Sequence, residues 1–196
     1  MMQDRNNRTG ICHRWWMVIL LWSVMGSVAA QERHHDGIDN VLQYVPYTTV
    51  IGLKVCGVES RDDWTTLLAA TAGSWLVSAG VAYTLKHSVR EWRPDQSDRR
   101  SFPSGHATFA FAGARMLHLE YGQTSPWISV AGYGVAALTA VDRVIKDRHH
   151  WYDVVAGAGI GVLSAELSYR LCHKWLKTDK VELAFSGNRL DVALRW

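Results

Sequence analysis

Long apolar stretches without a charged residue constrain the fold of this chain more than any other feature. The clearest, residues 64–85, contains no charged side chain and is rich in Ala, Leu and Val. A stretch of this length is too long for a strand and predicts a buried helix that could also cross a bilayer. Residues 126–141 are likewise uncharged, and further apolar stretches with a few charged positions cover residues 41–57, 107–120 and 152–171, all separated by short polar breaks. The chain is therefore expected to be all-α, a bundle of five to six helices.

Signals at the ends of these stretches support the assignment. Polar residues 60–63 stand where a helix cap is expected, and Pro126 stands in a first turn, where proline is tolerated. The last stretch contains Gly157, Gly159 and Gly161, which leave part of the helix surface without side chains. These glycines predict the close approach of a neighbouring helix.

The N-terminus has the pattern of an export signal. Arg5, Arg8 and Arg14 form a positive region, an apolar run covers residues 15–25, and small residues at 27–30 offer a cleavage site. An uncleaved membrane anchor is the alternative, although the apolar run is shorter than the roughly 20 residues that a span needs. We expect residues 1–30 to be a signal peptide or first membrane anchor, ahead of a domain at 31–178.

The C-terminal tail, residues 179–196, alternates apolar and polar positions on either side of a turn. The apolar positions are Val181, Leu183 and Phe185 before the turn and Leu190, Val192 and Leu194 after it. Alternation around a turn predicts a small β-hairpin. An isolated hairpin is marginally stable, so this one is expected to pack on the helices or on a second copy of the chain. A homo-oligomer is therefore left open.

Composition narrows the partners of the chain. The net charge of +3 comes without a stripe of Lys and Arg, so no nucleic-acid partner is expected. Ten Trp residues are typical either of a membrane interface or of a Trp-rich core. Cys12 lies in the export signal, and the sequence leaves open whether Cys56 and Cys172 form a disulfide.

Cationic residues stand at the edges of three apolar segments. Lys86, Arg93 and Arg143 are three cations that a bundle could bring together only around an anion, and Arg presents a planar fork that suits phosphate oxygens. Ser104 and Gly105 open a predicted helix, where backbone N–H groups and the helix dipole favour a negative charge. Together these residues predict a phosphate-binding site.

Two histidines and one carboxylate supply the reactive groups. His149 and Asp153 are four residues apart, so on one helix they share a face. A carboxylate that binds one ring nitrogen leaves the other nitrogen free to attack. His106 then remains to protonate a leaving oxygen and to activate water. Each feature taken singly has an ordinary explanation as a surface charge or a turn, and only their joint occurrence predicts catalysis.

The joint pattern KxxxxxxRP, PSGH and RxxxxxHxxxD resembles the three-part signature of the PAP2 superfamily. That superfamily includes bacterial class A acid phosphatases, lipid phosphate phosphatases and vanadium haloperoxidases. The resemblance covers residues 64–171, with one departure: Asp142 stands where the family usually has Ser. An acid there could weaken anion binding unless it points away. His150 lacks the four-residue spacing to Asp153 and is expected to be a bystander.

The resemblance implies a phosphatase that needs neither a metal nor a cofactor. His149 would be the nucleophile that forms a phosphohistidine, Asp153 would orient it, and His106 would be the general acid. The phosphate oxygens would be held by Lys86, Arg93, Ser104, Gly105 and Arg143. The expected substrate is a phosphomonoester or lipid-linked phosphate, such as phosphatidate, lipid A or undecaprenyl diphosphate. A broad-specificity soluble acid phosphatase and a vanadium haloperoxidase are the alternatives.

Two topologies fit the sequence. In one, six segments span a membrane and the positive N-terminus stays inside. In the other, the signal is cleaved and the remaining helices form a soluble or peripheral bundle. Both arrangements put His149 on the extracytoplasmic side, which in a bacterium is the periplasmic side.

Overall fold

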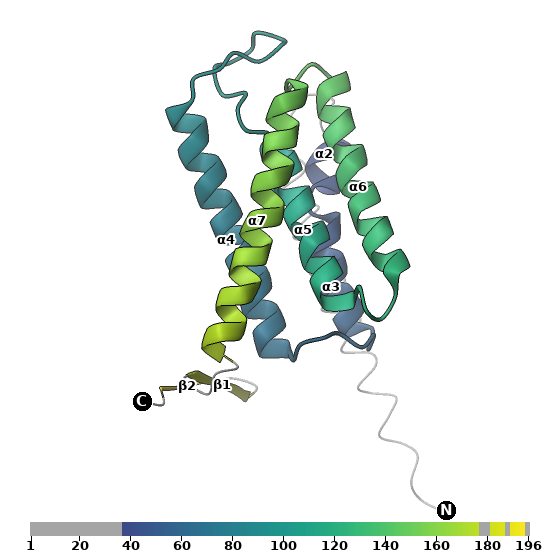
Figure 1. Ribbon diagram of the computed structural model, residues 1–196, viewed down its shortest axis with the longest axis vertical. Coiled ribbons are helices and arrows are strands. Elements are labelled where there is room, and N and C mark those ends of the chain that lie inside the picture. The colour runs from purple at the N-terminus through teal and green to yellow at the C-terminus, as the bar shows by residue number, and fades with distance from the viewer. Residues whose placement is uncertain (1–36, 177–180, 187–188, 195–196) are drawn as a thin grey trace, which may run out of the picture.

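The computed structural model describes residues 37–176, 181–186 and 189–194, which form six helices and one pair of strands (Figure 1). The helices are α2 (Gly37–Leu42), α3 (Val45–Val55), α4 (Trp64–Ser88), α5 (Gly105–Tyr121), α6 (Pro126–Ile145) and α7 (Trp151–Leu176). Strands β1 (Val181–Ser186) and β2 (Arg189–Leu194) pair antiparallel. The prediction of an all-α bundle is confirmed. The predicted signal, residues 1–30, lies outside the described residues.

Helix α5 is the centre of the bundle. It packs against α3, α4, α6 and α7, and ten of its 17 residues are buried. Figure 1 shows α5 behind α7 and α6, with α4 on the far side of α7. Because the PSGH segment leads directly into α5, the fold carries that motif to one end of the bundle axis.

Two of the three predicted glycines bring α7 against α5. A Cβ at Gly161 would lie 2.2 Å from the Thr108 carbonyl oxygen, and a Cβ at Gly157 would lie 2.5 Å from the Ser104 carbonyl oxygen. Both contacts are with backbone, so a side chain there could not be accommodated by rotation of its neighbour. Gly159 has no atom within 4 Å of such a Cβ, so the prediction of close packing was wrong for this glycine.

The helix ends follow the local sequence. Asp63 caps α4 by accepting hydrogen bonds from the backbone N–H groups of Thr65 and Thr66, as the polar break predicted. Pro126 stands in the first turn of α6. The stretch 41–57 was predicted as one segment but covers the last residues of α2 and all of α3, because Pro46 stands in the first turn of a new helix and cannot continue the earlier one.

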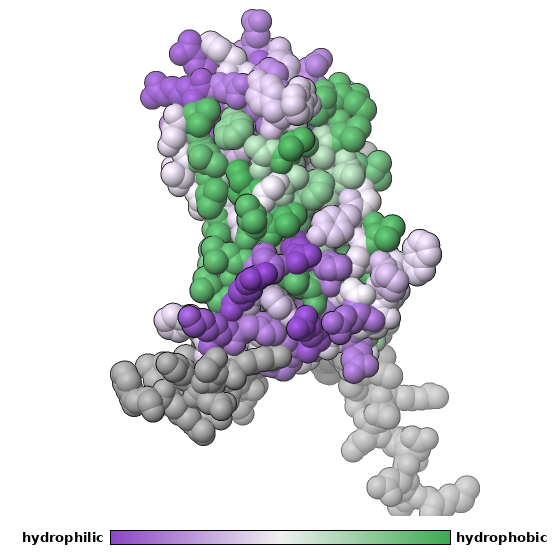
Figure 2. All heavy atoms as spheres, in the orientation of Figure 1, coloured by the Kyte–Doolittle hydropathy of each residue, from purple (hydrophilic) through white to green (hydrophobic). Residues whose placement is uncertain are grey.

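The outer helices α4, α6 and α7 turn mostly small residues inward and large apolar residues outward. The buried residues of α7 include Gly157, Gly161, Ser164, Ala165 and Ser168. The outward positions of the same helix carry large apolar side chains that are 45–69% exposed, namely Val155, Leu163, Leu167 and Leu171. Helices α4 and α6 follow the same pattern. Figure 2 shows the result on one face, an apolar band between hydrophilic residues at the two ends.

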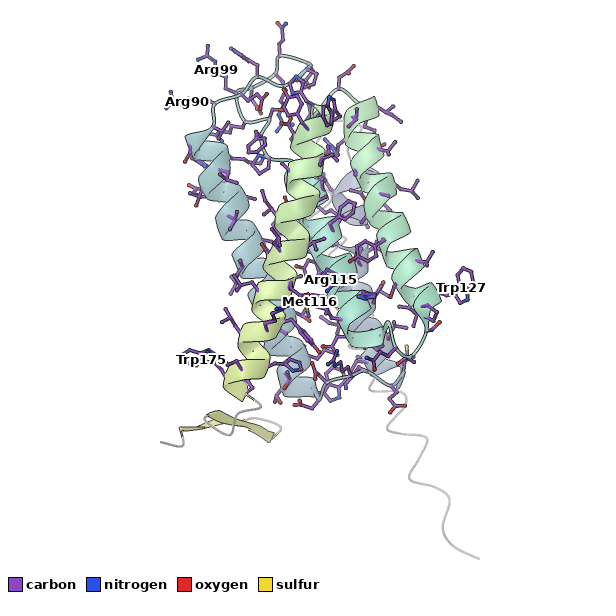
Figure 3. All side chains as sticks on the ribbon, in the orientation of Figure 1. Arg90, Arg99, Arg115, Met116, Trp127 and Trp175 are labelled. Carbon is purple, nitrogen blue, oxygen red and sulfur yellow. The ribbon has the colours of Figure 1, made fainter. Side chains whose placement is uncertain are left out.

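Tryptophan contributes to this surface and not to the core. Every Trp within residues 37–176 is exposed, so the alternative of a Trp-rich core was wrong for this part of the chain. Trp64, Trp127 and Trp175 lie at helix ends on one side of the bundle, where Figure 3 labels the last two. Trp92 and Trp151 lie at the opposite end, beyond α4 and at the start of α7.

Candidate active site

The three sequence motifs meet at one end of the bundle. The last turn of α4 and the loop after it carry the first motif, the start of α5 carries the second, and the connection from α6 to α7 carries the third. Figure 3 labels Arg90 and Arg99 on the α4–α5 loop at this end. Backbone bonds join the motifs, since Ser104 N–H donates to the Asp153 carbonyl oxygen at 3.0 Å.

His149 and Asp153 lie together and are shielded from solvent. His149 is 3% exposed and Asp153 is fully buried. The His149 Nδ1 atom lies 3.7 Å from Asp153 Oδ2, which is an ion-pair distance and too long for a hydrogen bond. His149 lies in the connection before α7 and Asp153 in its first turn, so the prediction of one shared helix face was wrong, although the two side chains lie close together. The backbone N–H of His149 donates to the Arg143 carbonyl oxygen at 3.2 Å, which ties the end of α6 to the residues ahead of α7.

The cations approach His149 from different segments. Lys86 lies in the last turn of α4, where its Nζ donates to the Arg100 carbonyl oxygen at 3.0 Å. Arg93 Nε pairs with Asp98 Oδ1 at 2.9 Å, and Arg93 also donates to the Arg148 carbonyl oxygen. Arg143, in the last turn of α6, is only 2% exposed. The loop, α4 and α6 thus converge as the anion-site prediction requires.

Burial and positive charge together keep His149 neutral. Desolvation lowers the pKa of His149 most, and the charges of Lys86, Arg93 and Arg143, with His106, lower it further. A neutral imidazole has an unprotonated nitrogen for nucleophilic attack. The same charges that would bind a phosphate therefore also maintain the reactive form of the histidine.

The N-terminus of α5 supplies the remaining groups. Ser104 is the N-cap residue, and its hydroxyl, which is fully buried, accepts a hydrogen bond from Ala107 N–H. Gly105 is the first residue of α5. The half-buried His106 has its Nε2 atom 2.8 Å from Asn40 Oδ1 of α2. The start of α5 and the connection from α6 to α7 thus bring the two histidines to the same end of the bundle.

Some of the residues at this end were missed by sequence reasoning. Ser101 Oγ donates to Asp153 Oδ2 at 2.5 Å. Asn40 contacts His106 from a helix 66 positions away, and no local pattern connects them. Asp142, the departure from the family pattern, pairs with Lys146 at 3.1 Å, and this (i, i+4) spacing was readable in the sequence. The pairing offsets the negative charge that had been expected to disturb anion binding.

His150 also contacts Asp153, and its expected lack of a catalytic role stays a prediction. Its backbone N–H donates to Asp153 Oδ2 at 2.9 Å, and its ring Nδ1 lies 3.4 Å from the same oxygen. Among the described residues, Glu91, His150 and Asp153 also form a group whose ligand atoms lie within 4.8 Å of one another, close enough to hold a metal ion. Asp153 Oδ2 in this group already accepts two hydrogen bonds, and the absence of a metal requirement stays a prediction.

Comparison with known proteins identifies the family. A model of the PAP2 superfamily matches residues 64–177, more than half of the chain and all three motifs. The chain belongs to the PAP2 superfamily. The match begins at the first residue of α4 and extends one residue past the end of α7. The superfamily region therefore coincides with the four long helices that bring the motifs together.

The names of two relatives refer to lipid substrates. The chain is 41% identical over 136 residues to a lipid A 1-phosphatase of Porphyromonas gingivalis, a match that covers 69% of this chain and 31% of that protein. It is 32% identical over 122 residues to a putative phosphatidate phosphatase of Drosophila melanogaster, covering 58% of this chain and 31% of that protein. The chain thus spans about a third of the length of these PAP2 relatives.

A solved structure shares the fold. The crystal structure of Aquifex aeolicus LpxE superposes with a TM-score of 0.54 at 21% sequence identity. The similarity covers 73% of this chain and 91% of that one. At this identity the comparison supports the PAP2 helical fold alone.

Proposed function

We propose that this PAP2 protein is a phosphatase that removes phosphate from a lipid-linked substrate through a phosphohistidine. The observation that carries the proposal is the burial of a neutral His149 beside Asp153 and among three cations. An uncharged nucleophile within a positive pocket is suited to attack a phosphate dianion, because the cations stabilise charge as it moves between phosphate oxygens.

The reaction has two steps with His149 and His106 in different roles. In the first, His149 Nε2 forms a bond to phosphorus, the ester P–O bond breaks, and protonated His106 gives its proton to the leaving oxygen. In the second, His106 takes a proton from water, the oxygen of that water bonds to phosphorus, and the P–N bond breaks. Asp153 holds the Nδ1 side of His149 throughout, so that Nε2 faces the phosphate.

The phosphate-binding residues divide between side chains and backbone. Lys86, Arg93 and Arg143 hold the equatorial oxygens as cations, and no metal is needed in this role. Gly105 contributes its N–H at the start of α5, where the helix dipole favours negative charge. Ser104 acts chiefly by capping α5, because its hydroxyl accepts a hydrogen bond from Ala107 N–H in the structure.

A lipid substrate is favoured by the surface of the bundle. Three helices, α4, α6 and α7, are long and apolar enough to cross a membrane. Their large apolar residues face outward, and exposed Trp residues mark both ends, as expected for a bundle with aromatic belts at two interfaces. Trp151 and Trp175 are about 36 Å apart along α7 at 1.5 Å per residue, compared with a hydrocarbon core of about 30 Å. We therefore favour an integral membrane enzyme over a soluble or peripheral one.

The functional test compares three substrates with the purified protein in detergent. These are p-nitrophenyl phosphate, phosphatidate in mixed micelles, and bromide with peroxide and vanadate. We expect both phosphate esters to be hydrolysed, phosphatidate with the higher kcat/KM, and no bromide oxidation. His149→Ala should abolish hydrolysis, whereas His118→Ala, a matched change at the other end of α5, should not. Substantial turnover by His149→Ala would refute the nucleophile, and turnover of p-nitrophenyl phosphate alone would favour a soluble-type acid phosphatase.

Cysteine labelling tests which side of the membrane the active site faces. We propose that the active site faces the extracytoplasmic side, on the basis of the positive N-terminal region and the count of spans. Cys56 is an exposed free thiol just after α3, at the end opposite the active site. In a Cys12→Ser background, an impermeant maleimide should label Cys56 only after the cells are permeabilised. Labelling in intact cells would place the active site on the cytoplasmic side.

The domain boundaries remain proposals. Residues 1–30 act as signal or anchor, 31–178 form the phosphatase domain and 179–196 form a hairpin appendage. Mass spectrometry of the mature N-terminus tests the first boundary. Truncation after residue 178 tests the last, and retained activity with unchanged size on a column would assign the tail no catalytic or oligomeric role.

A further inference from the structure

Ser101 stands in the loop before α5, three residues ahead of the PSGH helix cap. Its side chain is fully buried, and its hydroxyl donates to Asp153 Oδ2 at 2.5 Å. Its backbone N–H donates to the Glu91 carbonyl oxygen at 3.1 Å, which fixes the residue to the start of the same loop. The hydroxyl therefore has a defined direction, with Asp153 as its acceptor.

Asp153 depends on few donors to hold its carboxylate. Oδ2 accepts hydrogen bonds from the Ser101 hydroxyl and the His150 backbone N–H, and the His150 ring Nδ1 lies 3.4 Å from it. Oδ1 is buried with no hydrogen-bond partner among the described residues. The charged or titratable groups that face it are His149, His150, Lys86 and Glu91. A buried carboxylate is stable only when it is hydrogen-bonded, and its orientation follows its donors.

We infer that Ser101 is a positioning residue that orients Asp153, so that the Asp153 carboxylate faces Nδ1 of His149. The inference rests on the proposed phosphatase function and extends it to a residue that lies outside the three motifs. Of the groups that contact Oδ2, the His150 N–H belongs to the backbone and survives any substitution except proline. The two side-chain contacts are the Ser101 hydroxyl at 2.5 Å and the His150 ring Nδ1 at 3.4 Å, and the shorter one is removed by a change at Ser101.

The experiment measures kcat and KM separately for p-nitrophenyl phosphate. Ser101→Ala should lower kcat by about tenfold or more, as expected for loss of a hydrogen bond to a charged group, with KM changed less than about threefold. Ser101→Thr retains the hydroxyl and should recover most of the activity. Ser101→Cys has nearly the same size but a weak donor, so it should resemble Ser101→Ala without leaving a cavity.

Two further comparisons separate positioning from stability. Ser168, another buried serine, donates to the Ala70 carbonyl oxygen between α7 and α4, away from the site. Ser168→Ala should lower the melting temperature without lowering kcat. In an Asp153→Asn background, Ser101→Ala should lower kcat little further, because Asp153, the residue through which Ser101 acts, is already altered.

The outcomes distinguish the inference from the proposed function. A wild-type protein without phosphatase activity overturns both. An active wild type with unchanged kcat in Ser101→Ala and Ser101→Cys overturns the role of Ser101 alone. Equal, additive losses in the wild-type and Asp153→Asn backgrounds would also overturn it, because Ser101 would then act by a route other than Asp153.

Discussion

Replacing Gly161 by alanine is expected to force α7 away from α5. The added Cβ would lie 2.2 Å from the Thr108 carbonyl oxygen and 2.9 Å from the Ala112 nitrogen, both backbone atoms. Ordinary contact begins near 3.4 Å, so the helices must separate by about 1 Å. Overpacking of this kind costs about 1–3 kcal/mol in the free energy of unfolding.

Gly159 provides a control on the same helix. A Cβ there meets no atom within 4 Å, so Gly159→Ala should gain up to about 1 kcal/mol from helix propensity. Gly161→Ala gains the same helix propensity, so the two variants should differ by the overpacking cost alone, roughly 1–3 kcal/mol, or about 2–12 °C in melting temperature for a chain of this size. Circular dichroism at 222 nm during heating in detergent measures the difference. Melting temperatures within 2 °C of each other would refute the tight α5–α7 contact.

Other predictions concern the chemistry. The pKa of His149 is lowered, so its neutral form persists below pH 6.5, the ordinary histidine value. On acidification, kcat/KM should therefore not fall with an apparent pKa near 6.5. A pH–rate profile with such a fall would contradict the assignment of His149 as the nucleophile. The same shift affects stability. In the unfolded chain His149 has its ordinary pKa and binds a proton below about pH 6.5, so the free energy of unfolding in urea should decrease as the pH falls below that value. The decrease should be smaller in His149→Gln. Asp142→Asn should change kcat/KM by less than about threefold, because Lys146 already offsets the acid; a larger gain would mean that Asp142 opposes phosphate binding. His106→Ala should slow hydrolysis of phosphatidate far more than that of p-nitrophenyl phosphate, since a poor leaving group needs the proton more, and equal losses would argue against a general acid.

The helices and the motif residues could be predicted because their signals are local. Uncharged stretches define α4 and α6, and Asp63 and Pro126 define helix starts. His149 and Asp153 lie close together because only four residues separate them, although His149 precedes the first residue of α7. The resemblance then supplies the expected roles of the motif residues. Each of these inferences needs only a few neighbouring positions in the sequence.

The rest depends on contacts between distant segments. The bond between His106 and Asn40 joins residues 66 positions apart, and the bond between Ser101 and Asp153 joins residues 52 positions apart. The three glycines look alike in the sequence, yet only Gly157 and Gly161 face α5, because the facing side is set by the rotation of α7. The outward direction of the large apolar residues likewise follows from packing, which is why composition alone left the membrane question open.

The outward leucines have a consequence for how the chain folds. The inner faces of α4, α6 and α7 are mostly Gly, Ala, Ser and Thr, which bury little apolar area per residue, so the hydrophobic effect gives these three helices little drive to pack in water. In the integral membrane arrangement proposed above, lipid tails surround the exposed Leu163 and Leu167, and the small inner faces become the best remaining contacts between the helices. Packing of the helices should therefore follow their insertion into the membrane. A detergent that extracts the protein must then replace the part of its stability that the lipid supplied. Helix α6, which packs mainly on α5, is the element expected to detach first when that environment is removed.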